Sequence, residues 1–274
     1  MSKKLRIGGA SGFWGDSVIA TPQLLNGNDL DFIVYDYLAE ITMSIMARAR
    51  AKDATKGYAV DFVSSVLKLN LRQIADQKVK ILSNAGGVNP EACAEAIREL
   101  IKELKLDLKV SVVLGDDLMT EKNKFSELNT KEMYSNEDFP AEDKIASINA
   151  YLGAFPIAEA LKSGADIVIT GRSVDSAVTL GACIYAFGWS EKEYDKLAAG
   201  SLAGHIIECG TQSTGGNFTD WELVSKDLHQ IGYPIVEVSE DGSFDCTKSK
   251  NSTGMVSFGT VAEQMLYELS LIHI

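Results

Sequence analysis

Short β-branched segments alternate with longer amphipathic segments along this chain of 274 residues. Five of the short segments have the length and composition of buried strands, and segments with helical spacing follow them. The first of these expected strands opens the stretch 5–16 and runs into a glycine-rich turn, and the others lie at 31–36, at 80–84, at 110–115 and within 165–175. Such alternation is typical of a mainly parallel sheet with helices on both faces. We therefore expect a doubly wound, Rossmann-like α/β fold.

The other segments add detail to this expectation. Residues 118–143 are charged and polar, as expected for a flap or surface excursion, and a further strand is expected near 146–151. Residues 190–199 have helical spacing. Late in the chain, Asp241 and Gly242 lie between two apolar runs, which predicts a β-hairpin.

Each expected strand ends in polar or glycine-rich sequence. The candidate ligand-binding residues at these ends are Gly9, Ser11, Gly12, Asp36, Asn84, Gly86, Gly87 and Asp175. Three charged residues, Asp116, Asp117 and Arg172, also follow expected strands. Ligands of open α/β sheets bind outside the carboxyl ends of the strands. Five ends at one edge of a sheet therefore predict a composite binding site.

The first glycine-rich turn leaves two interpretations open. Its glycines have the spacing G-x-x-G-x-x-G, which is neither the dinucleotide fingerprint nor a P-loop. NAD(P) is therefore not expected, although exposed N–H groups in such a turn can hold an anion. The turn can equally be a tight connection without a ligand. Asp36 could bind a ribose hydroxyl, as in Rossmann folds, but capping of the next helix is the favoured role.

The stretch 203–220 combines a histidine with a glycine-rich polar loop. If residues 201–209 are helical, His205, Glu208 and Cys209 share one face. His205 could then transfer protons with Glu208 as its orienter, or it could be a packed histidine with a satisfied hydrogen bond. Cys209 is expected to be a buried thiol. The candidate ligand-binding residues of the loop are Gln212, Thr214, Gly215, Gly216 and Asn217.

The charged residues at the strand ends are candidates for binding an anion or a metal ion. Arg172 could hold a carboxylate or a CoA phosphate, or it could form an ion pair with Asp166 or Asp175. Asp116 and Asp117 are candidate ligands of a divalent metal. No paired-histidine metal motif is present, so acid–base chemistry by His205, Glu208 and Arg172 is preferred to metal binding.

The overall composition limits the classes of partner. A net charge of −12 disfavours nucleic acid, whose affinity comes from clustered Lys and Arg. Four separated cysteines without a C-x-x-C pair indicate reduced thiols in a cytoplasmic protein. The most apolar helical segment, 174–189, is short for a membrane span and contains Asp175. We expect a small-molecule substrate, no membrane or nucleic-acid partner, and a homo-oligomer as an option.

The last six residues, Leu269–Ile274, stop an amphipathic helix without a cap. They match the translation of a common sequencing adapter. We therefore expect residues 1–268 to form one α/β domain that is truncated at its C-terminus, followed by a non-native tail at 269–274.

Six motifs together resemble the acyclic terpene utilisation protein AtuA family. They are GGASGFWGD at 8–16, DYLAE at 36–40, NAGGVNP at 84–90, GDD at 115–117, TGRSVDS at 170–176 and GHIIECGTQSTGGNF at 204–218. The resemblance covers residues 6 to about 268 and implies the N-terminal domain of the family, to which many members add a small C-terminal domain. It also implies a place in the catabolism of acyclic terpenes, which passes through acyl-CoA thioesters, but no defined reaction.

Two functions follow from these observations. The first is an enzyme acting on a small carboxylate or an acyl-CoA, of the lyase, hydratase or hydrolase type, with a divalent metal or a CoA thioester as candidate ligand. The second is a non-catalytic subunit that binds an acyl-CoA-type ligand or organises a pathway.

Overall fold

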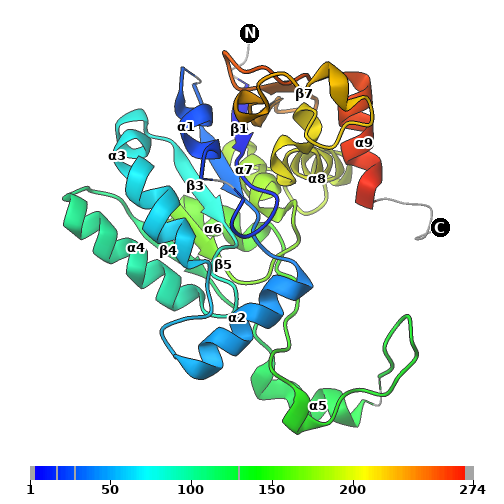
Figure 1. Cartoon of the computed structure of the whole chain (residues 1–274). Helices are drawn as coiled ribbons and strands as arrows, with labels where there is room; N and C mark the ends of the chain where they lie inside the picture. The colour runs from blue at the N-terminus through cyan, green and yellow to red at the C-terminus, as the bar shows by residue number, and fades with distance from the viewer. Residues whose placement is uncertain (1–3, 17, 28, 129, 269–274) are drawn as a thin grey trace.

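A seven-stranded sheet forms the body of the protein (Figure 1). The structure is a computed structural model that describes residues 4–16, 18–27, 29–128 and 130–268, so the expected tail at 269–274 lies outside the described residues. The strands are β1 Leu5–Gly9, β2 Phe32–Tyr35, β3 Lys80–Ser83, β4 Val110–Val113, β5 Ile167–Thr170, β6 Pro234–Val238 and β7 Phe244–Lys248.

The order of the strands across the sheet is β4-β5-β3-β2-β1-β6-β7. Strands β1 to β5 pair in parallel, β6 runs antiparallel to β1, and β7 runs antiparallel to β6. The predictions of a mostly parallel α/β sheet and of a late hairpin are confirmed. The Rossmann-like part of the prediction is not confirmed, because this order differs from the 3-2-1-4-5-6 order of that fold.

Two hydrophobic clusters pack against the sheet, and in the central strands β2, β3 and β5 successive residues belong to different clusters. In β2, Ile33 and Tyr35 belong to one cluster, whereas Phe32 and Val34 belong to the other. This alternation follows from the pleat, which points successive side chains to opposite faces. The first cluster includes residues of α1 Ala20–Leu25, α2 Glu40–Lys52, α3 Lys68–Gln77 and α4 Pro90–Leu104. The second includes residues of α6 Phe155–Lys162, α7 Ala177–Phe187 and α8 Tyr194–Glu208.

Helix α8 comes unusually close to the end of β1, and two glycines allow it. A Cβ on Gly9 would lie 2.1 Å from the main-chain oxygen of Ile207, and one on Gly12 would lie 2.9 Å from the Cα of Cys209. Any larger side chain would push α8 away from the sheet. These two glycines therefore set the position of the last turn of α8. The helix predicted at 190–199 begins later and continues to Glu208.

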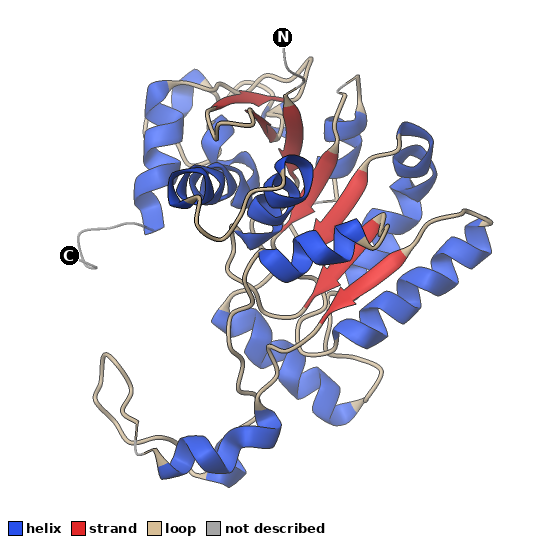
Figure 2. Cartoon of the chain, turned by 180° about the vertical axis from the view of Figure 1, so that it is seen from behind, coloured by secondary structure: helices blue, strands red, loops and turns tan. Residues whose placement is uncertain are grey.

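The segment between β4 and α6 projects from the body as an arm that carries α5 Lys122–Glu127 (Figures 1 and 2). The strand expected near 146–151 is present only as isolated bridges, such as Asp117 with Asn149. The returning chain then pairs Leu152 with Ser173, just beyond β5. The prediction of a surface excursion is confirmed, and its return brings the chain back to the carboxyl edge of the sheet.

The last described element is α9 Phe258–Glu268, which packs against α8. The side-chain amide of Gln264 donates to the main-chain oxygen of His205 at 2.9 Å. Within the described ranges, no helix is both long enough and apolar enough to cross a membrane.

Candidate functional site

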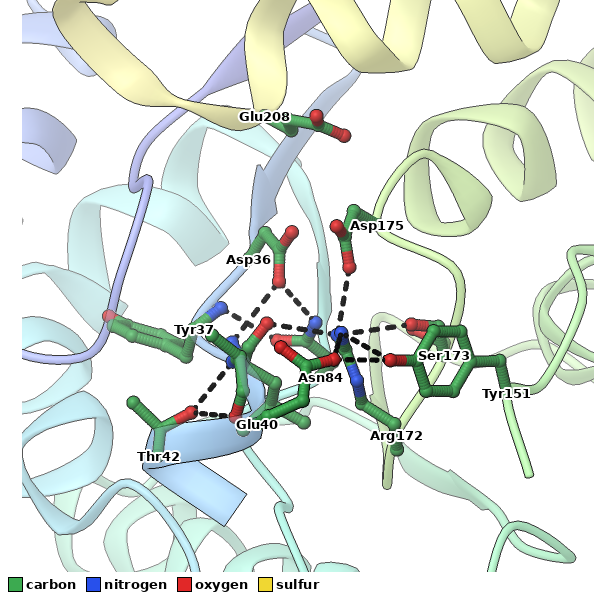
Figure 3. Close-up of polar contacts among 12 residues, drawn as sticks. Asp36, Tyr37, Glu40, Thr42, Asn84, Tyr151, Arg172, Ser173, Asp175 and Glu208 are labelled. Atoms are coloured by element: carbon green, nitrogen blue, oxygen red, sulfur yellow. Dashed lines mark hydrogen bonds and ion pairs between the residues drawn. The ribbon is translucent and has the colours of Figure 1, made fainter. Parts of the chain in front are cut away.

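Three carboxylates meet where β2, β5 and α8 end. They belong to Asp36, Asp175 and Glu208, and one oxygen of each lies within 4.8 Å of the others. In the part of the chain that the structure describes, they are the one group of three or more metal-ligating side chains this close together. Figure 3 shows them gathered beside Arg172. The expectation that several strand ends contribute to one place therefore holds for these residues.

The Asp36 carboxyl is buried and held from several sides. Its Oδ1 accepts hydrogen bonds from the Asn84 side-chain amide and, at 3.2 Å, from the main-chain N–H of Leu38. The Asn84 oxygen in turn accepts from the N–H of Tyr37 at 2.8 Å. The hydroxyl of Ser11 donates to the main-chain oxygen of Asp36 at 2.9 Å. The ends of β1, β2 and β3 thus converge on one acid.

This environment changes the proton affinity of Asp36. Burial raises the pKa of its carboxyl to about 7, and the charge of Asp175 acts in the same direction. The hydrogen bond from Asn84 opposes the change because it favours the ionised form. A carboxyl with such a pKa can both give and take a proton at neutral pH.

The Arg172 guanidinium lies next to the three carboxylates, and 6% of the Arg172 side chain is exposed. Its Nη1 lies 2.8 Å from Asp175 Oδ1 and 2.9 Å from the oxygen of Leu38. The guanidinium carbon of Arg172, Cζ, lies 4.3 Å from the ring centre of Tyr151. The Tyr151 hydroxyl contacts both Arg172 and Glu40. Burial works against the charge, but Asp175 and Tyr151 outweigh it and raise the pKa of Arg172.

The ion pair between Arg172 and Asp175 confirms one of the two predicted pairings. Asp166 instead pairs with Lys80 at 3.1 Å, at the opposite end of β5. Nη1 of Arg172 already donates to protein oxygens. Arg172 is therefore better placed to neutralise negative charge in the site than to bind a ligand.

Asp116 and Asp117 lie outside the group of three carboxylates. Asp116 Oδ2 accepts from the N–H of Arg172 at 2.8 Å and from the Asn149 amide at 2.9 Å. Asp117 accepts from the N–H of Met119 at 3.0 Å and pairs with Arg50 at 3.4 Å. Both side chains therefore hold the base of the arm, and metal binding by them stays a prediction.

The prediction that His205 and Glu208 share one face of a helix is confirmed. His205 Nδ1 lies 2.8 Å from Glu208 Oε1, and Nε2 lies 3.1 Å from the main-chain oxygen of Met265 in α9. Cys209 is buried, as expected, and its sulfur lies 2.9 Å from the Tyr267 hydroxyl. Helix α9 thus contacts the side chains of both His205 and Cys209 at the end of α8.

The loop that follows α8 packs inward more than its composition predicts. Residues Gly210–Thr214 form a tight 3₁₀ turn, and the Thr214 hydroxyl donates to the oxygen of Gly232 at 2.7 Å. Gly215 has a φ of 111° and packs on Val224. Ser213 is buried, while Gly216 and Asn217 are exposed. Ligand binding by Gln212, Thr214, Gly215, Gly216 and Asn217 stays a prediction, and Thr214 already has a packing role.

The glycines after β3 have a similar packing role. A Cβ on Gly86 would lie 2.4 Å from the oxygen of Thr170, and Gly87 has a φ of 55° with Met46 directly against it. These contacts bring α2 and the end of β5 close to Asn84. Ligand binding by these glycines is not tested by their packing.

Sequence reasoning missed Tyr151 as a site residue. Tyr151 lies at the return of a long charged segment, and no local pattern connects it with Arg172. The available signals were the strand expected near 146–151, which ends at Tyr151, and the apolar run that starts there. Glu40 is the last residue of the motif at 36–40, but its contact with Tyr151 depends on the path of the arm.

A family model described as "Acyclic terpene utilisation family protein AtuA" matches residues 5–271. The chain belongs to this family. The predicted resemblance is therefore confirmed over nearly the whole chain. No curated protein and no solved structure matches the chain. Within this AtuA family member, each of the six recognised motifs contributes to the network around Asp36 and Arg172. The contributing residues are Ser11, Asp36, Asn84, Asp116, Arg172, Asp175 and Glu208.

Proposed function

We propose that this AtuA family member is an enzyme that acts on a small carboxylate or an acyl-CoA thioester by proton transfer. The reaction is of the lyase, hydratase or hydrolase type, within the catabolism of acyclic terpenes or related acids that the family name indicates. The observation that carries the proposal is the meeting of Asp36, Asp175 and Glu208 within 4.8 Å. Like charges this close share protons, as paired catalytic carboxylates do.

The position of the group in the fold supports a ligand site. The helix that follows β3 belongs to one hydrophobic cluster, and the helix that follows the neighbouring strand β5 belongs to the other. Ligands of open α/β sheets bind where adjacent connections leave toward opposite faces, at the carboxyl ends of the strands. Asn84 and Arg172 lie at these two strand ends.

Asp36 is the proton carrier in this proposal. A general acid or base works best when its pKa lies near the working pH, and burial raises the pKa of Asp36 to about 7. The ring nitrogens of His205 already face two oxygen atoms, so His205 is less suited to take a proton. Arg172 pairs with Asp175 at 2.8 Å and so places a positive charge next to the group.

A cavity of about 320 Å³ at the base of the arm is the place we assign to the body of the ligand. Its wall combines apolar side chains of Ala47, Val88 and Met119 with the polar side chains of Arg50, Asp117 and Asn149. Asn149 also donates to Asp116, whose carboxylate accepts the N–H of Arg172. The apolar part of this wall suits a ligand with a hydrocarbon body. Arg50 would hold a ligand anion only in exchange for Asp117, with which it pairs at 3.4 Å.

The same three carboxylates fit a divalent cation. Carboxylate oxygens are the ligands that Mg²⁺ and Ca²⁺ prefer, and Asp36, Asp175 and Glu208 each offer one. A bound cation would supply Lewis-acid activation of a carbonyl oxygen. Titration calorimetry with Mg²⁺ and with Ca²⁺ tests this ligand, and binding that disappears in Asp175→Asn assigns it to the group.

The function is tested by turnover. The purified chain is incubated with a panel of saturated, unsaturated and hydroxylated acids and their CoA thioesters, and the products are identified by mass spectrometry. Asp36→Asn should lower the rate on any accepted substrate at least about 100-fold while the protein stays folded. Asp245→Asn, at an exposed position on β7, is the matched control. Binding of panel members without any turnover would instead identify a non-catalytic binding subunit.

A further inference from the structure

Strand β4 forms one edge of the sheet, and no described strand covers its outer side. The main-chain oxygen of Lys109 accepts from the N–H of Ile167 in β5 at 3.0 Å. Because alternate residues of a parallel strand face opposite neighbours, Val110 and Val112 turn their N–H and C=O groups outward. One of these groups, the oxygen of Val110, receives a long hydrogen bond of 3.4 Å from Arg98 Nη2. Such a row of outward main-chain groups is a template for another strand.

The two edges of the sheet differ in their side chains. Val110 packs on the cluster beneath α4, and the pleat points Val112 and Leu114 to the same side. Residues 110–114 carry no charge, and Leu114 is 53% exposed. At the opposite edge, β7 carries Asp245 and Lys248. Charged side chains discourage pairing at an exposed edge, so β7 is protected and β4 is open to a partner.

The groove beside β4 has one basic and one acidic end. It has a volume of about 650 Å³ and lies between β4 and α4, which Figure 1 shows together at one side of the molecule. Arg98 contacts the start of β4, and Glu91 lies about two turns earlier in α4, on the order of 10 Å along the helix. A second copy rotated by 180° about an axis through this edge places its basic end against the acidic end of the first. A copy in the same orientation would bring like charges together.

We propose that this edge is the interface of a two-fold dimer, in which β4 pairs antiparallel with β4 of a second copy and Val112 lies on the axis. Val112 then faces its own counterpart, and Val110 faces Leu114 of the second copy, which covers the exposed leucine. Arg98 of each copy reaches Glu91 of the other. The two seven-stranded sheets become one continuous sheet, and the symmetry closes the assembly at two chains. This inference goes beyond the proposed function and does not depend on it.

The dimer is tested first on the unmodified whole chain. Sedimentation over a wide range of protein concentration should give twice the mass of one chain. The mass of a single chain at every concentration would overturn the proposal and leave this edge to a strand of a different protein. In hydrogen exchange, the outward amide of Val112 should exchange more slowly at high than at low protein concentration, because the dimer covers it. Equal rates would also overturn the proposal, and this measurement needs no variant.

The position of the axis is tested by charge at Val112. Val112→Lys and Val112→Glu each place like charges opposite one another and should raise the dissociation constant of the dimer at least about tenfold. An equal mixture of the two variants places opposite charges face to face and should restore the mass of the dimer. Circular dichroism checks that each variant is folded. Dimers that persist in both variants, or a mixture of folded variants that stays monomeric, would overturn the assigned interface.

The matched control is Leu69→Lys, at an exposed apolar position on α3. It adds the same charge at a comparable apolar position away from β4, so the mass of the dimer should not change. Dissociation by Leu69→Lys would show that the interface lies elsewhere. None of these measurements needs a substrate, so failure of the dimer is distinguishable from failure of the proposed enzyme activity.

Discussion

The side-chain amide of Asn84, at the end of β3, donates to the carboxyl of Asp36, at the end of β2. Both side chains are buried, and the Asn84 oxygen is used by the N–H of Tyr37. Asn84→Ala should therefore lower the free energy of unfolding by about 1–3 kcal/mol, because it leaves buried polar groups without partners. Urea unfolding measures the loss. Asn123→Ala, at an exposed position on the arm, should change stability little. Equal stabilities of the two variants would contradict the role of Asn84.

The raised pKa of Asp36 predicts an unusual dependence of stability on pH. The folded carboxyl has a pKa of about 7, whereas an unfolded Asp has one near 3.9, about three units lower. Between these values the folded state binds a proton that the unfolded state has lost, so stability falls as pH rises through this window and levels off above it. The total fall from this group is on the order of 4 kcal/mol.

Urea unfolding at several pH values between about 4 and 8 tests this linkage. Burial also raises the pKa of Asp16 and of Asp116, so their contributions have the same sign. The comparison with Asp36→Asn isolates the contribution of Asp36, because the variant cannot titrate at this position. The wild type should lose more stability than the variant over this range. Parallel curves would contradict the assignment.

Arg172 is expected to be structurally indispensable. Arg172→Leu would leave Asp175 without its cation and the oxygen of Leu38 without its donor. Breaking a buried ion pair on one side costs about 3–5 kcal/mol, and the partly exposed Asp175 places the expected loss at the lower end. The matched control is Arg98→Leu, which removes a surface pair with Glu95 that contributes at most about 1 kcal/mol. Thermal unfolding of both variants checks the difference, and similar losses would contradict the buried pair.

Gly9 is expected to tolerate no side chain. A Cβ there would lie 2.1 Å from the main-chain oxygen of Ile207, so Gly9→Ala must move α8 or β1. Overpacking of this kind costs about 1–3 kcal/mol or more. Gly153→Ala is the control, because no atom lies within 4 Å of its added Cβ. A Gly9→Ala protein as stable as the Gly153→Ala protein would show that α8 does not lie as closely on β1 as described.

The periodicity of the sequence was sufficient to predict the central part of the fold. The runs around Ile33, Ile81 and Val168 are apolar and β-branched because these strands are buried on both faces, and such runs identify parallel strands. The order of the strands was not predictable. No local pattern records that β5 lies between β3 and β4, since that depends on which face the connecting helices occupy.

The candidate site was predictable residue by residue but not as a geometry. Asp36, Asp175 and Glu208 were each singled out by position, at strand ends or on the face of a helix. Their meeting depends on the close contact of α8 with β1, which follows from Gly9 and Gly12 only when the partner helix is known. The contact of His205 with the oxygen of Met265 has no sequence signal, because any residue of α9 could present that oxygen.

The most direct measurement is the titration of the Asp36 carboxyl in the whole, selectively ¹³C-labelled protein. The account predicts one aspartate carboxyl signal with a midpoint near pH 7 that is absent from Asp36→Asn, because burial and Asp175 both oppose ionisation. If every aspartate carboxyl signal titrates below about pH 5, in the ordinary range of this side chain, Asp36 does not share a proton within a carboxylate centre, and the account is contradicted.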